Sequence, residues 1–148
     1  THSVEKELSL GDGKGTLIEM DLEIDLSKTT AKEFGVELTN ARGESFRVGY
    51  DTQSSRFYSD RTNAGEKSFS DLFSKDKHFA VRSSQNRRLR LHLIFDVSSA
   101  EMFADGGEVA ITDIYFPTED FARAKIFSDG GKTALLRARA WKLKSIWR

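Results

Sequence analysis

The chain has 148 residues, with 23 basic and 23 acidic side chains and a formal net charge of zero. That length suits one domain that can bury a core without covalent staples. The charge balance excludes a surface that is basic throughout, as nucleic-acid and membrane-surface proteins require. No Cys is present, which excludes disulfides and thiolate metal sites. No apolar run reaches the length of about 18 residues that a membrane-spanning helix needs.

The clearest periodicity lies in the first quarter of the chain. Apolar and acidic residues alternate there, with Ile18, Met20, Leu22, Ile24 and Leu26 on one face and Glu19, Asp21, Glu23 and Asp25 on the other. This alternation predicts a half-buried antiparallel strand with an acidic outer face. The carboxylates are expected either to be solvated or to pair with basic residues of a neighbouring strand. A calcium site is disfavoured, because a single strand provides no loop to wrap an ion.

The next segments predict short strands separated by turns. Residues 27–33 are expected to form one helical turn capped by Ser27, and strands are expected at residues 34–38, at 46–50 and around Phe57. Residues 61–77 form the longest irregular stretch and carry Phe69, Leu72 and Phe73. Connections of this length tend to be docked or functional. These three side chains are therefore expected either to cover the end of their own domain or to contact another one.

The second half of the chain predicts six more strands. They are expected at residues 78–81, 89–95, 100–104, 109–116, 124–127 and 135–144, with a tight hairpin at Asp105-Gly106-Gly107. Turn signals recur about every 8–12 residues, as in sandwiches. The predicted fold is all-β, a two-sheet antiparallel β-sandwich of about ten strands, forming a single domain over residues 1–148.

Several short motifs carry a resemblance to a known family. Residues 96–103 read D-x-S-S-x-E-x-F, and residues 112–117 read T-D-I-Y-F-P. Residues 49–51 and 60–65 read G-Y-D and D-R-T-x-x-G, and residues 127–147 read F-x-x-G-G followed by W-x-L-x-S-I-W. Together they resemble the C-terminal β-sandwich domain of glycoside hydrolase family 32, the family of invertases, inulinases and levanases.

The resemblance implies an accessory domain. The family's catalytic propeller carries W-x-N-D-P-N-G, R-D-P and E-C-P motifs, but the one proline here, Pro117, follows Phe116 and there is no Cys. The resemblance therefore implies a non-catalytic module without a cofactor. Its partner would be the catalytic five-bladed propeller of the same polypeptide, in an extracellular or periplasmic enzyme. A fructan-binding module and an oligomerisation domain are the alternatives. A start at Thr1 without Met or a signal peptide predicts a trimmed or excised piece of a longer product.

The acidic corner between residues 96 and 101 allows two interpretations. Retaining glycosidases place two carboxyl groups about 5–5.5 Å apart around a sugar-sized pocket, and Asp96 and Glu101 flank a turn. Buried carboxylates are more often held in satisfied structural networks, because an unpaired buried charge is costly. We therefore predict a structural polar network of Asp60, Arg61, Asp96, Ser99 and Glu101. Within it, Arg61 and Glu101 are expected to form an ion pair.

The remaining candidates concern metals and sugars. His2, His78 and His92 do not cluster with carboxylates at metal-ligand spacing, so no metal site is predicted. Trp147 and Tyr58 are candidates for stacking on a sugar ring. Trp141 belongs to the closing motif and is expected to serve the core.

Overall fold

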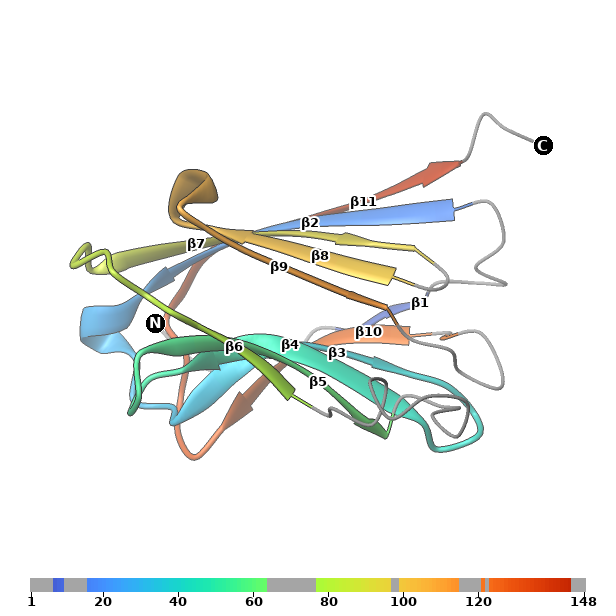
Figure 1. The fold of residues 1–148 in the computed structure, drawn as a ribbon, viewed down its shortest axis with the longest axis horizontal. Coiled ribbons are helices and arrows are strands. Elements are labelled where there is room, and N and C mark those ends of the chain that lie inside the picture. The colour runs from blue at the N-terminus through green and yellow to red at the C-terminus, as the bar shows by residue number, and fades with distance from the viewer. Residues whose placement is uncertain are drawn as a thin grey trace.

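A computed structural model describes residues 7–9, 16–63, 77–96, 99–114, 121 and 123–144. Two antiparallel sheets pack face to face (Figure 1). Sheet A contains, in spatial order, β1 (Glu7–Ser9), β10 (Arg123–Asp129), β3 (Glu33–Thr39), β4 (Ser45–Asp51), β5 (Arg56–Asn63) and β6 (Lys77–Val81). Sheet B contains β11 (Leu135–Lys144), β2 (Thr16–Asp25), β7 (Arg88–Phe95), β8 (Ser99–Ala104) and β9 (Val109–Ile114). The prediction of a two-sheet antiparallel sandwich is confirmed.

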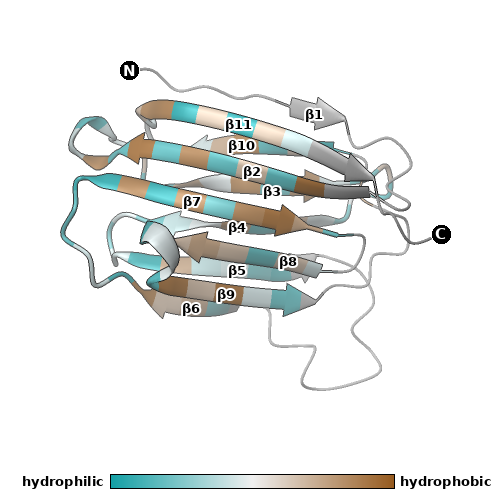
Figure 2. Cartoon of the chain, turned by 90° about the horizontal axis from the view of Figure 1, so that it is seen from above, coloured by the Kyte–Doolittle hydropathy of each residue, from teal (hydrophilic) through white to brown (hydrophobic). Residues whose placement is uncertain are grey.

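The core lies between the sheets and follows the alternation of the sequence. On β7, Leu89, Leu91, Leu93 and Phe95 are buried, whereas the residues between them face outward (Figure 2). Strand β2 pairs with β7 in register, Ile24 opposite Leu89 and Met20 opposite Leu93, so both strands turn their apolar residues to the same side. Fully burying one such side chain contributes about 1.5–3 kcal/mol. This row is therefore a main source of the domain's stability.

The outer face of sheet A carries a transverse aromatic row. Register pairing places Phe127, Gly35, Gly49, Tyr58 and Phe79 side by side on β10, β3, β4, β5 and β6. A Cβ on Gly49 would lie 3.3 Å from the Phe127 ring, so the missing side chains make room for that ring to lie flat. Phe127 is consequently buried although it points away from the core.

Arg47 covers this row from the solvent side. Its guanidinium lies 4.1 Å from the centroid of Phe127 and forms ion pairs with Glu37 at 2.9 Å and Asp129 at 2.8 Å. Burial alone would disfavour the charged guanidinium, but the two carboxylates outweigh it and raise the pKa of Arg47 above its ordinary value. The cation thus stays charged while it shields the aromatic ring.

Two turns differ from their predictions. The 3₁₀ turn η1 (Leu26–Lys28) is capped by Asp25, whose carboxylate accepts the backbone N–H of Ser27 at 3.0 Å. The prediction of a Ser27 cap was wrong, because the cap is Asp25, two residues earlier, whose carboxylate accepts the free N–H of Ser27 itself. Hydrogen bonding to the Ser27 hydroxyl also lowers the pKa of Asp25. At the hairpin after β8, the chain makes a second 3₁₀ turn, η3 (Asp105–Gly107), in place of a two-residue turn.

Segments 82–87 and η3 are joined by a buried ion pair. Arg82 Nε donates to Asp105 Oδ2 at 2.8 Å, and its Nη2 reaches the backbone oxygen of Asn86 at 2.9 Å. Burial opposes the charge of Arg82, but the bonds to Asp105 raise its pKa overall. This pair fixes one end of the sandwich. In the described part of the chain, no helix is long and apolar enough to cross a membrane.

Candidate functional site

Arg61 lies on the inner face of β5 and bridges the two sheets. The alternation of Phe57, Ser59 and Arg61 points all three into the interior. Arg61 Nη1 lies 3.2 Å from Asp113 Oδ1 on β9, in the opposite sheet. The side chains are only 8% and 2% exposed, so water screens this pair weakly. The ion pair therefore connects sheets A and B through their interior.

Asp113 has further partners that satisfy its second oxygen. The Ser59 hydroxyl donates to Asp113 Oδ2 at 2.8 Å, and His78 Nδ1 lies 3.4 Å from the same oxygen. This order places the carboxylate between the hydroxyl and the imidazole, so His78 cannot act as a base on Ser59. The arrangement satisfies a buried charge and does not form a nucleophilic triad.

The predicted Arg61–Glu101 ion pair was wrong. Glu101 stands between the buried Ala100 and Met102 on β8, so its side chain points to the outer face of sheet B. Among the described residues no ion pair joins it to Arg61, which pairs with Asp113. Asp113 belongs to the T-D-I-Y-F-P motif and Arg61 to the D-R-T motif. Alternation with Val109 and Ile111 already placed Asp113 inward, and this signal could have identified the pair.

The other members of the predicted network lie apart from Arg61. Asp60 points to the outer face of sheet A, opposite Arg47 on β4 and Lys77 on β6. Asp96 is exposed at the end of β7, where its backbone N–H donates to the oxygen of Ser99 at 2.8 Å. Asp96 and Ser99 thus close the corner between β7 and β8. The structure divides the predicted network among four places: the interior, the outer faces of the two sheets, and the corner between β7 and β8.

The acidic face of β2 is paired with basic neighbours. His92 on β7 lies between two carboxylates, with Nε2 3.1 Å from Glu19 Oε2 and Nδ1 2.9 Å from Asp21 Oδ1. Arg88 lies 3.4 Å from Glu23. On the other side, the register sets Arg137 and Arg139 of β11 opposite Glu23 and Asp21. Of the two alternatives left open for this face, pairing with neighbouring strands is the one observed.

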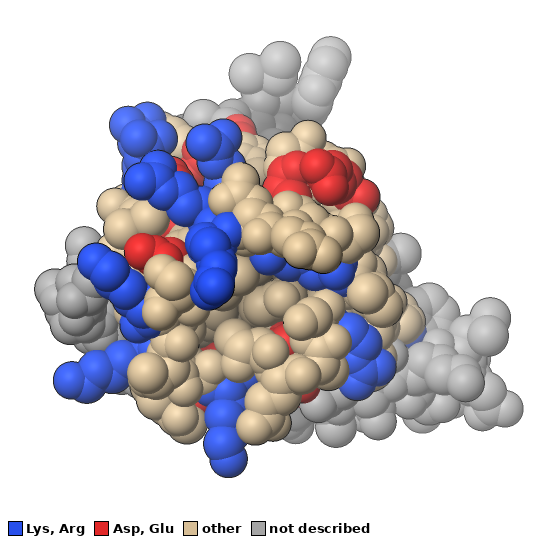
Figure 3. Space-filling model, turned by 90° about the vertical axis from the view of Figure 1, so that its left-hand side faces the viewer, with Lys and Arg blue, Asp and Glu red and all other residues tan. Residues whose placement is uncertain are grey.

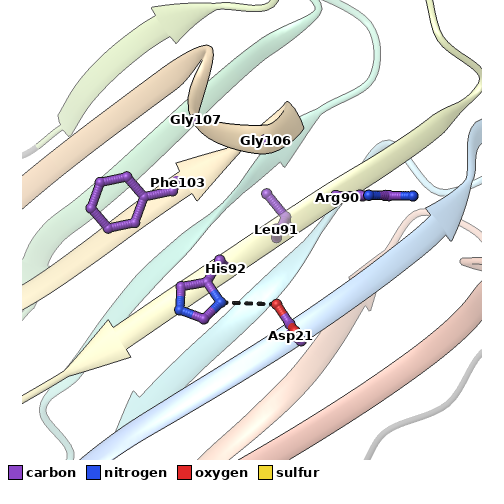
Figure 4. A pocket seen from close by; sticks show the side chains of 7 residues that line it. All are labelled: Asp21, Arg90, Leu91, His92, Phe103, Gly106 and Gly107. Atoms are coloured by element: carbon purple, nitrogen blue, oxygen red, sulfur yellow. Dashed lines mark hydrogen bonds and ion pairs between the residues drawn. The ribbon is translucent and has the colours of Figure 1, made fainter.

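A shallow hollow of about 350 Å³ opens beside His92 on the same face (Figure 4). It is lined by Asp21, Arg90, Leu91, His92, Phe103, Gly106 and Gly107. His92 and Asp21 are bonded to each other across its floor, and the Phe103 ring lies 6.5 Å from the imidazole centroid. The described residues contain no group of three or more His, Cys, Asp or Glu that could hold a metal ion. The hollow offers polar contacts and one ring edge, without a nucleophile.

Neither the sugar-stacking candidates nor Trp141 behave as predicted where they can be seen. Tyr58 is only 3% exposed. Its hydroxyl donates to Glu33 at 2.6 Å, and its ring packs on Phe79. Burial and this hydrogen bond raise the pKa of Tyr58 well above its ordinary value. Trp141 was expected in the core but lies on the outer side of β11, 40% exposed. Trp147 is outside the described residues.

The predicted interface residues cannot be placed. Phe69, Leu72 and Phe73 fall between β5 and β6, in residues 64–76, which lie outside the described part of the chain. The strand that follows them, β6, exposes Phe79 and Val81 on its outer side.

Comparison with known proteins identifies the family of this sandwich. The profile of the C-terminal domain of glycosyl hydrolases family 32 matches residues 1–142. The chain belongs to this family. It matches the family's C-terminal, non-catalytic domain, which agrees with the absence of the three catalytic motifs from the sequence.

Relatives of the family 32 domain include a levanase and an exo-inulinase. A levanase of Bacillus sp. (strain L7) is 34% identical over 131 residues, which cover 88% of this chain and 14% of the levanase. An extracellular exo-inulinase of Aspergillus awamori is 32% identical over 147 residues, which cover 96% of this chain and 27% of that protein. The chain thus spans between about a seventh and a quarter of the length of these relatives.

Solved structures of family 32 enzymes contain the same fold. The exo-inulinase of Aspergillus awamori superposes with a TM-score of 0.79 and 27% identity, over 97% of this chain and 27% of that one. A fructofuranosidase of Schwanniomyces occidentalis gives a TM-score of 0.77 over 93% of this chain and 30% of its own, at 20% identity. The second likeness concerns the fold alone.

Proposed function

We propose that this domain supports a catalytic propeller of the same polypeptide, in an enzyme that hydrolyses fructans or sucrose, by packing against it. The observation that carries the proposal is the match of residues 1–142 to the C-terminal domain of family 32. Relatives that share this domain are named levanase and exo-inulinase. The interior ion pair of Arg61 and Asp113 suits a rigid support, because it holds the two sheets in one arrangement.

We propose β6 and the loop before it as the docking surface. Phe79 is 46% exposed and Val81 is 68% exposed, although both are large apolar side chains. They lie on β6, which is an edge strand of sheet A among the described strands, and edge strands can pair with another element. The sequence before β6 adds Phe69, Leu72 and Phe73, which lie outside the described residues, so apolar side chains are concentrated in this stretch of the sequence. Such concentrations characterise interfaces.

The acidic strand β2 is a weaker candidate for the same role. Its carboxylates at Glu19, Asp21 and Glu23 already pair with His92 and Arg88. Docking a partner there would require these pairs to be desolvated, which costs free energy without burying apolar area. We therefore place the propeller on the β6 side.

The supporting role is tested with a polypeptide that contains both the propeller and this domain. Hydrolysis of levan and inulin and the thermal midpoint of the propeller are measured with and without residues 1–148. We expect the domain alone to release no sugar, and its removal to lower the propeller's thermal midpoint. An unchanged midpoint would contradict the proposal. Sugar release by the domain alone would contradict its non-catalytic assignment.

The two alternative functions, fructan binding and oligomerisation, predict different behaviour of the isolated domain. A fructan-binding module would give saturable heat on titration with levan or inulin, and an oligomerisation domain would scatter light as a dimer or larger species. The burial of Tyr58 removes one of the two aromatic side chains on which the binding alternative rested. We expect flat titrations up to millimolar sugar and the scattering mass of a monomer.

A further inference from the structure

A polar pocket lies at one end of the sandwich, next to the end of β6. Its volume is about 260 Å³. Three segments that are distant in sequence form it: residues 26–29 after β2, residues 50–55 between β4 and β5, and residues 82–87 between β6 and β7. We call it the end pocket. Its lining residues are Leu26, Thr29, Tyr50, Thr52, Ser55, Arg82, Ser84, Gln85, Asn86 and Arg87.

The walls of the end pocket are fixed by hydrogen bonds. The Thr52 hydroxyl donates to the backbone oxygen of Ala31 at 2.8 Å, and the Arg82 backbone N–H donates to the oxygen of Ser55 at 2.9 Å. The buried Arg82–Asp105 ion pair holds the third segment from below. A site with walls held in this way loses little conformational entropy when a ligand binds.

Several groups at the end pocket remain available for a ligand. Within the described structure, the side-chain amides of Gln85 and Asn86 donate to no other group, and the Ser55 hydroxyl has no partner. Arg87 is exposed and forms no ion pair with a described residue. The pocket thus combines neutral donors and acceptors with one free guanidinium.

Further cations surround the end pocket. Lys28, Lys32 and Lys132 are exposed on the turns at this end. Backbone hydrogen bonds join these turns, because the oxygen of Lys132 accepts the N–H of Thr30 at 2.8 Å and the oxygen of Arg87 accepts the N–H of Leu26 at 2.8 Å. Figure 3, which faces this end, shows basic side chains on several sides of it and an exposed acidic patch at the upper right.

The acidic residues at this end do not neutralise those cations. Asp25 accepts hydrogen bonds from Ser27, and Asp51 accepts the backbone N–H groups of Gln53 and Ser54. Asp105 is bound to Arg82 in the interior. These carboxylates keep their charge, but Arg82, Arg87, Lys28, Lys32 and Lys132 outnumber Asp25, Asp51, Asp105 and the exposed Glu108 at this end, although the net charge of the chain is zero. Such an excess of positive charge attracts an anionic ligand.

We propose that the end pocket binds an acidic oligosaccharide, a sugar chain that carries carboxylate groups. The carboxylate would bind the guanidinium of Arg87, which can grip two oxygens at once, with Lys28 beside it. Sugar hydroxyls would bind the amides of Gln85 and Asn86 and the hydroxyl of Ser55. Neutral donors and acceptors beside a cation favour a charged sugar over a simple phosphate chain. This ligand differs from the neutral fructans of the proposed enzyme, so the inference stands independently of it.

The test is calorimetric titration of the 148-residue chain with an oligogalacturonate, with inulin oligosaccharides and with inorganic polyphosphate. We expect saturable heat with the oligogalacturonate alone, and an affinity that falls as salt rises. Arg87→Gln should weaken binding about tenfold, since it removes a charge-assisted hydrogen bond. Arg90→Gln is the matched control, because Arg90 is an exposed cation of sheet B outside the end pocket, and it should bind like wild type.

Four outcomes would overturn the inference. They are no saturable heat at millimolar oligogalacturonate, equal affinity for the neutral sugar, equal affinity for polyphosphate, and equal losses in the two variants. Arg87 is exposed, so its replacement should leave folding intact; the thermal midpoints of both variants check this. Neither variant touches Phe79 or Val81, so a failure here leaves the docking proposal unaffected.

Discussion

At the scale of single residues, Arg61 and Asp113 set the cost of separating the two sheets. Replacing Arg61 with Ala leaves a carboxylate that is 2% exposed without its guanidinium partner. Breaking a buried pair in this way costs about 3–5 kcal/mol of unfolding free energy. We expect Arg61→Ala to lose about that much, measured by urea unfolding.

Glu101→Gln is the control for this ion pair. Glu101 lies on the outer face and forms no ion pair with a described residue, so its replacement should change the unfolding free energy by less than about 0.5 kcal/mol. Large losses of similar size in Glu101→Gln and in Arg61→Ala would instead support the Arg61–Glu101 pair that the sequence predicted. A double variant, Arg61→Met with Asp113→Leu, should recover part of the loss, since no buried charge remains.

Tyr58 makes stability depend on alkaline pH. Its pKa in the folded chain is raised above the ordinary 10.0, so above pH 10 the unfolded chain loses this proton while the folded chain keeps it. The unfolded state then binds fewer protons, and stability falls as pH rises. Tyr58→Phe should therefore lose less stability than wild type between about pH 9 and about pH 11. At neutral pH it should cost about 1–2 kcal/mol, because Glu33 loses its donor. Parallel pH profiles in urea unfolding would contradict the burial of this hydroxyl.

At the scale of elements, the contact between β3 and β4 depends on two glycines. A Cβ on Gly35 would overlap the backbone oxygen of Val48 and approach the Gly49 Cα to 2.5 Å. Backbone atoms cannot move aside as a flexible side chain can, so the strands would have to separate. We expect Gly35→Ala to cost about 3 kcal/mol or more in urea unfolding.

Gly43 provides the control for Gly35. It lies in the turn between β3 and β4 at φ +81°, with nothing within 4 Å of a built Cβ. Asn tolerates this left-handed conformation better than other residues. Gly43→Asn should therefore stay within about 1 kcal/mol of wild type. Equal losses at the two positions would show that backbone freedom, and not close approach, is what both glycines provide.

The alternation of apolar and polar residues predicted the strands well, but it did not predict which side chains meet between the two sheets. The alternation of apolar and polar residues in β2 and β7 predicted both strands and the face of each that is buried. It could do so because the burial of one face determines which residues of a strand must be apolar. The pattern also placed Asp113 and Arg61 inward, yet the motif around Glu101 drew attention to a residue on the outer face. Which carboxylate meets Arg61 depends on how the two sheets stack, and no single strand contains that information. The prediction that Trp141 lies in the core was wrong for a similar reason, because the edge strand β11 buries neither of its faces fully.

At the scale of the whole molecule, one end and one edge differ from the rest of the surface. Phe79 and Val81 expose apolar area at the β6 edge, while the opposite sheet carries a paired charge ladder on β2 and β7. Replacing Phe79 and Val81 with Ser should leave the isolated domain folded, because neither side chain belongs to the core between the sheets. In a polypeptide that also carries the propeller, we expect the same double replacement to lower the propeller's thermal midpoint by several degrees. The matched control is Arg90→Ser with Thr112→Ser on sheet B, which should change nothing.

The most direct test of the docking claim is the reactivity of a single cysteine on β6. The chain has no native Cys, so Val81→Cys introduces one thiol whose alkylation can be followed by peptide mass spectrometry. Arg90→Cys on the outer face of sheet B serves as the reference position. We expect Val81→Cys to react rapidly in the isolated domain and to be protected when the propeller is joined to it, while Arg90→Cys reacts equally in both. Equal alkylation of Val81→Cys with and without the propeller would contradict docking at β6.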